Sequence, residues 1–295
     1  MATTMTNPTR TLSLGFSPCP NDTFIFHALV HGIVRVDGLD FAPRLEDVET
    51  LNRLAAEAVL DVTKISYGAI PYLVRDYVLL RSGGALGRGC GPLVVARDPI
   101  DPIDPAGLVS KRIAIPGRKT TANLLLRLFA PDAPAGEERI YSDIMPAVAR
   151  GEVDAGLIIH ESRFTYADHG LVKVVDLGEW WEQKTGLPIP LGGILARRDL
   201  GEATIHAIDG ALRRSVEHAF ADPAASRDYV RAHAQELDDK VTQQHIDLYV
   251  NQFSIDLGEE GGRAIHELFA RARRAGIIGA DVPSPFLDNS QGTSL

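Results

Sequence analysis

Residues 112–129 read RIAIPGRKTTANLLLRLF, which puts an apolar strand, a polar turn and an apolar helix in immediate succession. Residues 12–30, LSLGFSPCPNDTFIFHALV, repeat the same order of elements. Each stretch is followed by a further helix and a further strand, which are predicted at 48–59, 61–66, 143–150 and 153–159. Strands that alternate with helices are typical of parallel sheets with right-handed crossovers. The sequence therefore predicts an α/β protein built from two similar halves.

The rest of the chain predicts how the two halves are joined. Two short apolar segments, 91–96 and 192–196, each begin at a glycine, and we expect them to pair as a two-stranded hinge. Apolar residues at 3–4 spacing from about 205 to 275 predict helices that complete the first half. We therefore predict a larger, discontinuous lobe of residues 10–97 and 197–295, and a smaller inserted lobe of residues 98–196. We expect a central cleft between the two lobes. Open α/β sheets bind ligands at the carboxyl ends of their strands, and these ends would face each other across the cleft.

Charge limits the partners of this chain. Its 295 residues include 30 lysines and arginines against 39 aspartates and glutamates, a formal net charge of −9. A general nucleic-acid binder needs a basic surface that displaces counterions, and a polybasic membrane-surface protein needs clustered cations. We therefore expect neither nucleic acid nor a membrane as partner. A small anionic ligand stays open, because a few local groups decide its binding.

The cysteines and the apolar segments bear on the compartment. Two cysteines, Cys19 and Cys90, exclude a disulfide framework and a four-thiolate zinc site. The N-terminal segment has no apolar core of a signal peptide, and no stretch approaches the roughly 18 apolar residues of a membrane span. We therefore expect a soluble, cytoplasmic protein. The histidines show no obvious metal-ligand spacing, so we expect no metal.

His160 is the most informative single residue. It follows the apolar run 156–159, so it stands where a buried strand ends, and Glu161 comes directly after it. An imidazole in that position is suited to general acid–base chemistry near neutral pH. The alternative is a hydrogen-bonded histidine with a structural role.

Polar residues at the other strand ends and helix starts are candidates for ligand binding. Thr120 and Thr121 open a helix whose free N–H groups can bind a carboxylate, although a plain N-cap explains them equally well. The preceding turn lacks the glycine spacing of a nucleotide-triphosphate loop. Asn21 and Asp22 form the matching cap in the first half. Cys19, between two prolines of that turn, is a minor candidate for a catalytic thiolate.

Lys64, Ser66 and Tyr67 lie at the end of the strand that corresponds to the one before His160. Because equivalent strands of the two halves end at the cleft, we expect these side chains to enter it from the opposite lobe.

Several long segments resemble the 1,4-dihydroxy-6-naphthoate synthase family, which belongs to the futalosine route to menaquinone. They are SPCPNDTFIFHALVHG (from 17), LEDVETLN (from 45), TKISYGA (from 63), RSGGALGRGCGPLVVAR (from 81), IPGRKTTA (from 115), GEVDAGLIIHESRFTY (from 151) and VVDLGEWWEQKTGLPIPLGGILARRDLG (from 174). The resemblance implies a two-lobed fold like that of the type 2 periplasmic binding proteins. It also implies a lyase that acts on cyclic dehypoxanthine futalosine and releases 1,4-dihydroxy-6-naphthoate and a sugar-derived fragment.

The resemblance also implies roles for individual residues. His160 occupies the position of the family's catalytic histidine and would act as the base that starts ring opening. Ser66 with its neighbours and Thr120–Thr121 occupy substrate-contact positions, and no cofactor or metal is implied. Two alternatives stay open: a non-catalytic cytoplasmic protein that binds a small carboxylate, and the chorismate dehydratase of the same route.

Overall fold

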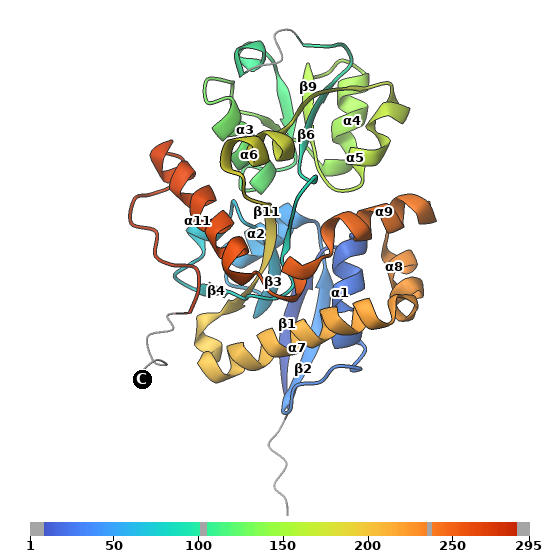
Figure 1. Cartoon of the computed structure of the whole chain (residues 1–295), viewed down its shortest axis with the longest axis vertical. Helices are drawn as coiled ribbons and strands as arrows, with labels where there is room; N and C mark the ends of the chain where they lie inside the picture. Colours follow the sequence, from blue (N-terminus) through green and yellow to red (C-terminus); the bar gives the residue numbers. More distant parts are fainter. Residues whose placement is uncertain (1–8, 101–104, 235–237, 288–295) are drawn as a thin grey trace, which may run out of the picture.

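The computed structural model describes residues 9–100, 105–234 and 238–287, and it contains two β-sheets (Figure 1). The first sheet has the strand order β2-β1-β3-β11-β4, and β5 pairs with β11. Its strands are β1 (Arg10–Phe16), β2 (Leu39–Leu45), β3 (Val62–Ser66), β4 (Tyr77–Leu79), β5 (Ala85–Gly87) and β11 (Ile189–Arg197). β1 runs parallel to β2 and β3, whereas β11 runs antiparallel to β3, β4 and β5.

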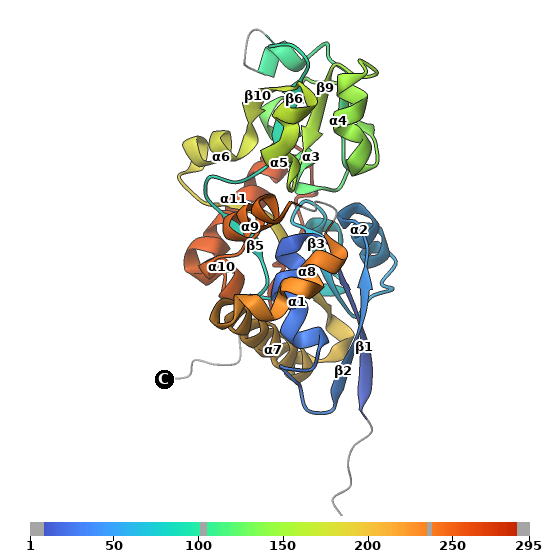
Figure 2. The same ribbon diagram turned by 90° about the vertical axis from the view of Figure 1, so that its right-hand side faces the viewer.

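The second sheet has the strand order β10-β6-β9-β7-β8. Its strands are β6 (Leu93–Ala96), β7 (Ile113–Ile115), β8 (Glu137–Glu138), β9 (Ala155–Ile158) and β10 (Val172–Asp176). β7 runs parallel to β8 and β9, and β6 runs antiparallel to β9 and β10. Helices α5 (Ser162–Thr165) and α6 (Leu177–Thr185) lie close to this second sheet, in the upper part of the molecule in Figure 2.

The repeated order predicted from the sequence is confirmed. The first sheet contains the unit β1-α1-β2-α2-β3, and the second contains β7-α3-β8-α4-β9. The helices of these units are α1 (Pro20–Val30), α2 (Val48–Ala56), α3 (Thr121–Phe129) and α4 (Tyr141–Ala149). The central strands β3, β7 and β9 are buried along their whole length, which explains their continuous apolar runs.

The two segments predicted as a paired hinge belong to different sheets. β6 pairs with β9 and β10 in the second sheet, while β11 pairs with β3, β4 and β5 in the first. The prediction that they pair with each other is therefore wrong, because each strand completes the antiparallel side of its own sheet. The chain still crosses twice between the sheets, at residues 88–92 and 186–188. By sheet membership the lobes divide at these crossings, somewhat before the predicted boundaries at 97/98 and 196/197.

The C-terminal helices cover the first sheet, as predicted (Figure 1). They are α7 (Glu202–Ala221), α8 (Arg227–His233), α9 (Asp239–Tyr249), α10 (Gln252–Ile255) and α11 (Gly258–Arg274). Buried Ser215 of α7 donates to the carbonyl of Ile25 at 2.6 Å and accepts from the N–H of Leu29 at 3.2 Å, which fixes α7 on α1. No helix in the described ranges is long and apolar enough to cross a membrane.

One apolar core continues from the first sheet into the second. It includes Ile65 and Leu195 of the first sheet together with Val94, Ile115 and Leu157 of the second. The two lobes are therefore in contact around their crossings.

Candidate active site

A cavity that is partly open to solvent lies between the two lobes. The larger lobe supplies Ser17, Asn21, Asp22, Val48, Lys64, Ser66, Ala85, Leu191, Gly192, His245 and Tyr249. The smaller lobe and its crossing segment supply Gly91, Pro92, Thr120, Thr121, Ala122, Ile159 and His160. The polar turns after β1 and β7 and the ends of β3 and β9 thus meet at one place, as expected for an open α/β sheet.

Tyr67 is the predicted cleft residue that the structure places elsewhere. Its side chain is fully buried in the apolar core, and its hydroxyl finds no hydrogen-bond partner among the described residues. Burial raises its pKa above the ordinary value. Lys64 and Ser66 line the cavity, and successive residues of an extended chain point to opposite faces. The prediction that Tyr67 enters the cleft is therefore wrong, because Tyr67 is one position out of step with Lys64 and Ser66.

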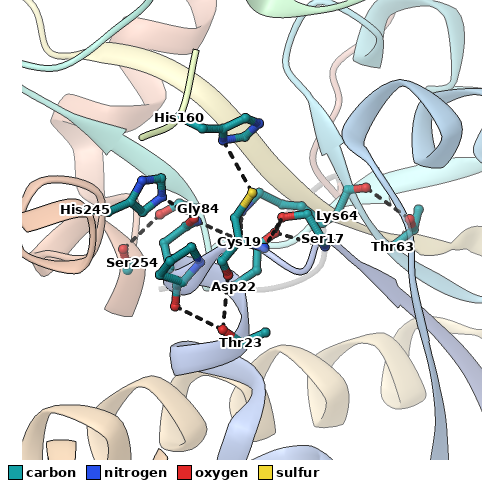
Figure 3. Close-up of polar contacts among 12 residues, drawn as sticks. Ser17, Cys19, Asp22, Thr23, Thr63, Lys64, Gly84, His160, His245 and Ser254 are labelled. Atoms are coloured by element: carbon teal, nitrogen blue, oxygen red, sulfur yellow. Dashed lines mark hydrogen bonds and ion pairs between the residues drawn. The ribbon is translucent and has the colours of Figure 1, made fainter. Parts of the chain in front are cut away.

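His160 stands at the wall of the cavity, directly after β9 (Figure 3). Its backbone has φ of 53°, a left-handed conformation that costs a non-glycine residue about 1–2 kcal/mol. The ring of Tyr141 meets the imidazole edge-on, with the ring centres 5.3 Å apart. Burial lowers the pKa of His160, and nearby acidic groups such as the Asp22 carboxylate only partly oppose this effect. The imidazole is therefore neutral at neutral pH and free to accept a proton.

Cys19 faces the same imidazole from the other lobe. Its Sγ lies 3.6 Å from His160 Nδ1 (Figure 3). Burial raises the pKa of the Cys19 thiol, and the nearby acidic groups, among them the Asp22 carboxylate, raise it further. The sulfur is consequently a neutral thiol that contacts the histidine, which does not fit a catalytic thiolate.

A buried ion pair stands on the larger-lobe side. Lys64 Nζ lies 2.5 Å from Asp22 Oδ1, and both side chains are almost fully buried. The other Asp22 oxygen accepts from the Ser17 hydroxyl at 2.7 Å and from the Ser17 N–H at 3.2 Å (Figure 3). Asn21 Nδ2 donates to Asp22 Oδ1 at 2.8 Å. Asp22 therefore anchors the lysine, and the ammonium group is the cation that the cavity wall presents.

Ser66 is held from behind by a residue that the sequence analysis did not single out. The Ser66 N–H donates to Asn52 Oδ1 at 3.0 Å, and Asn52 Nδ2 donates to Ser66 Oγ at 3.3 Å. Asn52 is fully buried on the inner face of α2. Because Ser66 Oγ accepts this bond, its own proton remains available for a ligand in the cavity.

The two threonine hydroxyls are both used within the protein. Thr120 Oγ1 accepts from the N–H of Asn123 at 3.2 Å and donates to the carbonyl of Gly117 at 2.8 Å, so Thr120 is the N-cap of α3. Thr121 Oγ1 donates to the carbonyl of Leu191 at 2.6 Å and accepts from the N–H of Gly68 at 3.1 Å, which joins the lobes. The groups of α3 that can bind an anion are therefore its first backbone N–H groups and not the threonine hydroxyls.

His245 is a functional candidate that sequence reasoning left among the weak histidines. It lies on α9, is fully buried, and lines the cavity. Its ring is stacked over that of His160 at 6.2 Å between centres, with an interplanar angle of 26°. In the sequence, His245 stands beside Ile246 and Tyr249 on the apolar face of a predicted helix. This position indicates that His245 is buried, but it does not indicate that His245 lies near His160.

Metal binding finds no support in the described part of the chain, where no group of three histidine, cysteine, aspartate or glutamate side chains could hold an ion. Both cysteines are free.

The fold is that of the periplasmic binding proteins. The alkanesulfonate-binding protein SsuA of Xanthomonas axonopodis pv. citri superposes with a TM-score of 0.69 at 15% identity, over 95% of this chain and 97% of that one. A crystal structure of an Archaeoglobus fulgidus protein agrees more closely, with a TM-score of 0.83 at 38% identity over 91% of this chain and 98% of that one. Fold and cavity together define a two-lobed α/β protein with a small-molecule site in the cleft.

Sequence comparison gives the family. Residues 12–274 match the profile of the menaquinone biosynthesis family. A 1,4-dihydroxy-6-naphthoate synthase from Thermus thermophilus is 60% identical over 93% of this chain and 97% of its own length. A second, from Streptomyces coelicolor, is 50% identical over 92% of this chain and 95% of its own length. The chain belongs to the menaquinone biosynthesis family and is an enzyme of the 1,4-dihydroxy-6-naphthoate synthase type, as its resemblance predicted.

Proposed function

We propose that this enzyme converts cyclic dehypoxanthine futalosine into 1,4-dihydroxy-6-naphthoate, with His160 as the general base. The observation that carries the proposal is the neutral imidazole of His160 at the cavity wall, held in a strained left-handed conformation. Strain of this kind persists where the surrounding structure enforces it, and it gathers at functional sites. The names of the two relatives supply the product class.

The base needs one ring nitrogen directed at the substrate. If Nδ1 carries the hydrogen and donates to the Cys19 sulfur, the Nε2 lone pair is free to take a substrate proton. A neutral thiol accepts such a weak bond without competing for the proton. We therefore assign Cys19 the role of orienting His160.

The substrate carboxylate is proposed to lie between the start of α3 and Lys64. The first N–H groups of α3 carry partial positive charge, and the Lys64 ammonium and the Ser66 hydroxyl lie on the facing wall. These groups would fix the substrate so that the bond to be broken is aligned with the base. The reaction requires a positioned base and a closed cleft, so we propose that it uses neither metal nor cofactor. We also propose that it takes place in the cytoplasm.

The test is direct incubation of the purified protein with cyclic dehypoxanthine futalosine, followed by the appearance of the naphthoate chromophore. Chorismate is offered in parallel. We expect turnover of the first compound only, and a His160→Gln variant that folds normally with kcat reduced by about 100-fold or more. The matched control is His206→Gln on the exposed side of α7, which should leave kcat unchanged. Binding without conversion would identify a receptor, and conversion of chorismate a dehydratase.

A further inference from the structure

Two buried acceptor atoms face each other across the cleft. Glu161 Oε2 and His245 Nδ1 lie 3.8 Å apart, and neither atom has a hydrogen-bond partner within the described residues. Glu161 follows β9 in the smaller lobe, whereas His245 lies on α9 over the larger lobe. The contact therefore exists only while the two lobes are together.

The second nitrogen of His245 shows where its hydrogen lies. Nε2 is 2.8 Å from Asn21 Oδ1, and Asn21 Nδ2 donates to Asp22 Oδ1 at 2.8 Å. The reversed amide would turn its oxygen toward the Asp22 carboxylate, so the oxygen must face His245 and Nε2 carries the hydrogen. In neutral His245, Nδ1 is then a bare acceptor opposite a carboxylate oxygen. Burial of two unsatisfied acceptors is costly, and one proton between them removes the cost.

The surroundings of His245 disfavour a buried imidazolium. Burial lowers the pKa of His245 well below its ordinary value, and the nearby His160 ring and Lys64 ammonium lower it further. A neutral carboxyl group that approaches from 3.8 Å to hydrogen-bond distance and donates to Nδ1 would satisfy both residues without a buried imidazolium. The other titratable groups around the pair are Cys19 and Asp22 at the start of α1, Tyr141 on α4 and Tyr249 on α9.

Glu161 also lines a second, smaller cavity next to the first. Its polar lining includes Ser17, Asp47, Tyr141, His160 and Glu161. His160 lines both cavities, so a substrate that spans them meets His160 at the boundary and Glu161 in the second cavity. The left-handed turn at His160 brings these two consecutive side chains to the same space.

We propose that Glu161 is the general acid of the reaction, with a proton held in the Glu161–His245 pair, and that the second cavity holds the departing fragment. This inference rests on the proposed role of His160 as base. His160 removes a substrate proton, and the electron pair left behind moves through the breaking bond onto the departing fragment. Glu161 protonates that fragment and becomes a carboxylate while His160 becomes an imidazolium, so charge is conserved. Return of the proton from His160 to Glu161 through water restores the resting enzyme.

The test compares Glu161→Gln with wild type in kcat and KM between pH 5 and 10. A glutamine side chain keeps the size of Glu161 and can donate to His245 Nδ1, but it supplies no proton. We expect kcat to fall by about 100-fold or more with little change in KM. We also expect the loss of kcat at alkaline pH, which marks deprotonation of the acid in wild type, to disappear. Glu179→Gln, the same change at an exposed position on α6, is the control and should behave as wild type.

His245→Gln tests the partner separately. His245 positions Glu161, so this variant should keep measurable turnover but move the alkaline fall of kcat to a different pH. The inference is overturned if Glu161→Gln retains kcat within about threefold of wild type, or if its kcat falls while the pH profile keeps its shape. Wild-type turnover combined with loss in His160→Gln establishes the base independently. Absence of turnover in wild type itself overturns the proposed function, and the role of Glu161 with it.

Discussion

Replacement of Asp22 by asparagine removes the carboxylate that pairs with the buried Lys64 ammonium. Nζ lies 2.5 Å from Oδ1, and the side chains are only 6% and 2% exposed. Loss of one partner of a buried pair costs about 3–5 kcal/mol, because the remaining charge stays out of water without compensation. We expect Asp22→Asn to lower the free energy of unfolding by that amount. The bonds from Ser17 and Asn21 to the same carboxylate place the expected loss in the upper part of this range.

Urea unfolding followed by circular dichroism measures this loss. The control is Glu46→Gln, which removes an exposed ion pair with Arg44 and should cost at most about 1 kcal/mol. The double variant Asp22→Asn/Lys64→Met carries no buried charge at either position, so it should be more stable than Asp22→Asn alone. If Asp22→Asn unfolds within 1 kcal/mol of wild type, or if the double variant recovers nothing, the lysine is not stabilised by Asp22 and the reasoning fails.

Three further predictions concern the lobe contact, pH and metals. A Cβ on Gly68 would lie 2.8 Å from the backbone oxygens of Lys119 and Thr120. Gly68→Ala should therefore push the lobes apart and raise KM in steady-state assays. An unchanged KM would contradict this close contact between the lobes. The pKa values of His160 and His245 are lowered in the folded protein, so the unfolded chain takes up protons at a higher pH than the folded protein does. The free energy of unfolding should therefore fall as the pH drops below about 6.5. Urea midpoints between pH 8 and 5 measure this fall, and the His245→Gln variant should show a smaller one. Prolonged treatment with EDTA should leave kcat unchanged, and loss of activity that added metal restores would refute a metal-free reaction.

Much of the fold could be predicted from the order of elements. A buried parallel strand must be apolar throughout, and the helix after it must have one apolar face, so both units were visible in the sequence. The antiparallel strands β6 and β11 were placed in the wrong pairing. Both strands are mainly apolar, and strand pairing depends on contacts between residues far apart in the chain, which no local pattern records.

The site, too, could be predicted from the sequence only in part. His160, Lys64, Ser66 and the start of α3 could be predicted because strand ends and helix starts converge in this architecture. Tyr67 was misplaced because side chains alternate along an extended chain, so Tyr67 lies on the face opposite to Lys64 and Ser66.

Two α/β units, the residues at their carboxyl ends and the family could all be recognised in the sequence alone. These properties depend on local periodicity and on the identity of side chains, both of which a linear chain carries. The folded structure was needed to show that Cys19 contacts His160, and that His245 faces Glu161, a residue far from it in the sequence. Those contacts join separate lobes across the cleft. They arise from the packing of α1 and α9 over one sheet against the end of β9 in the other, which is a property of the folded molecule and not of any segment.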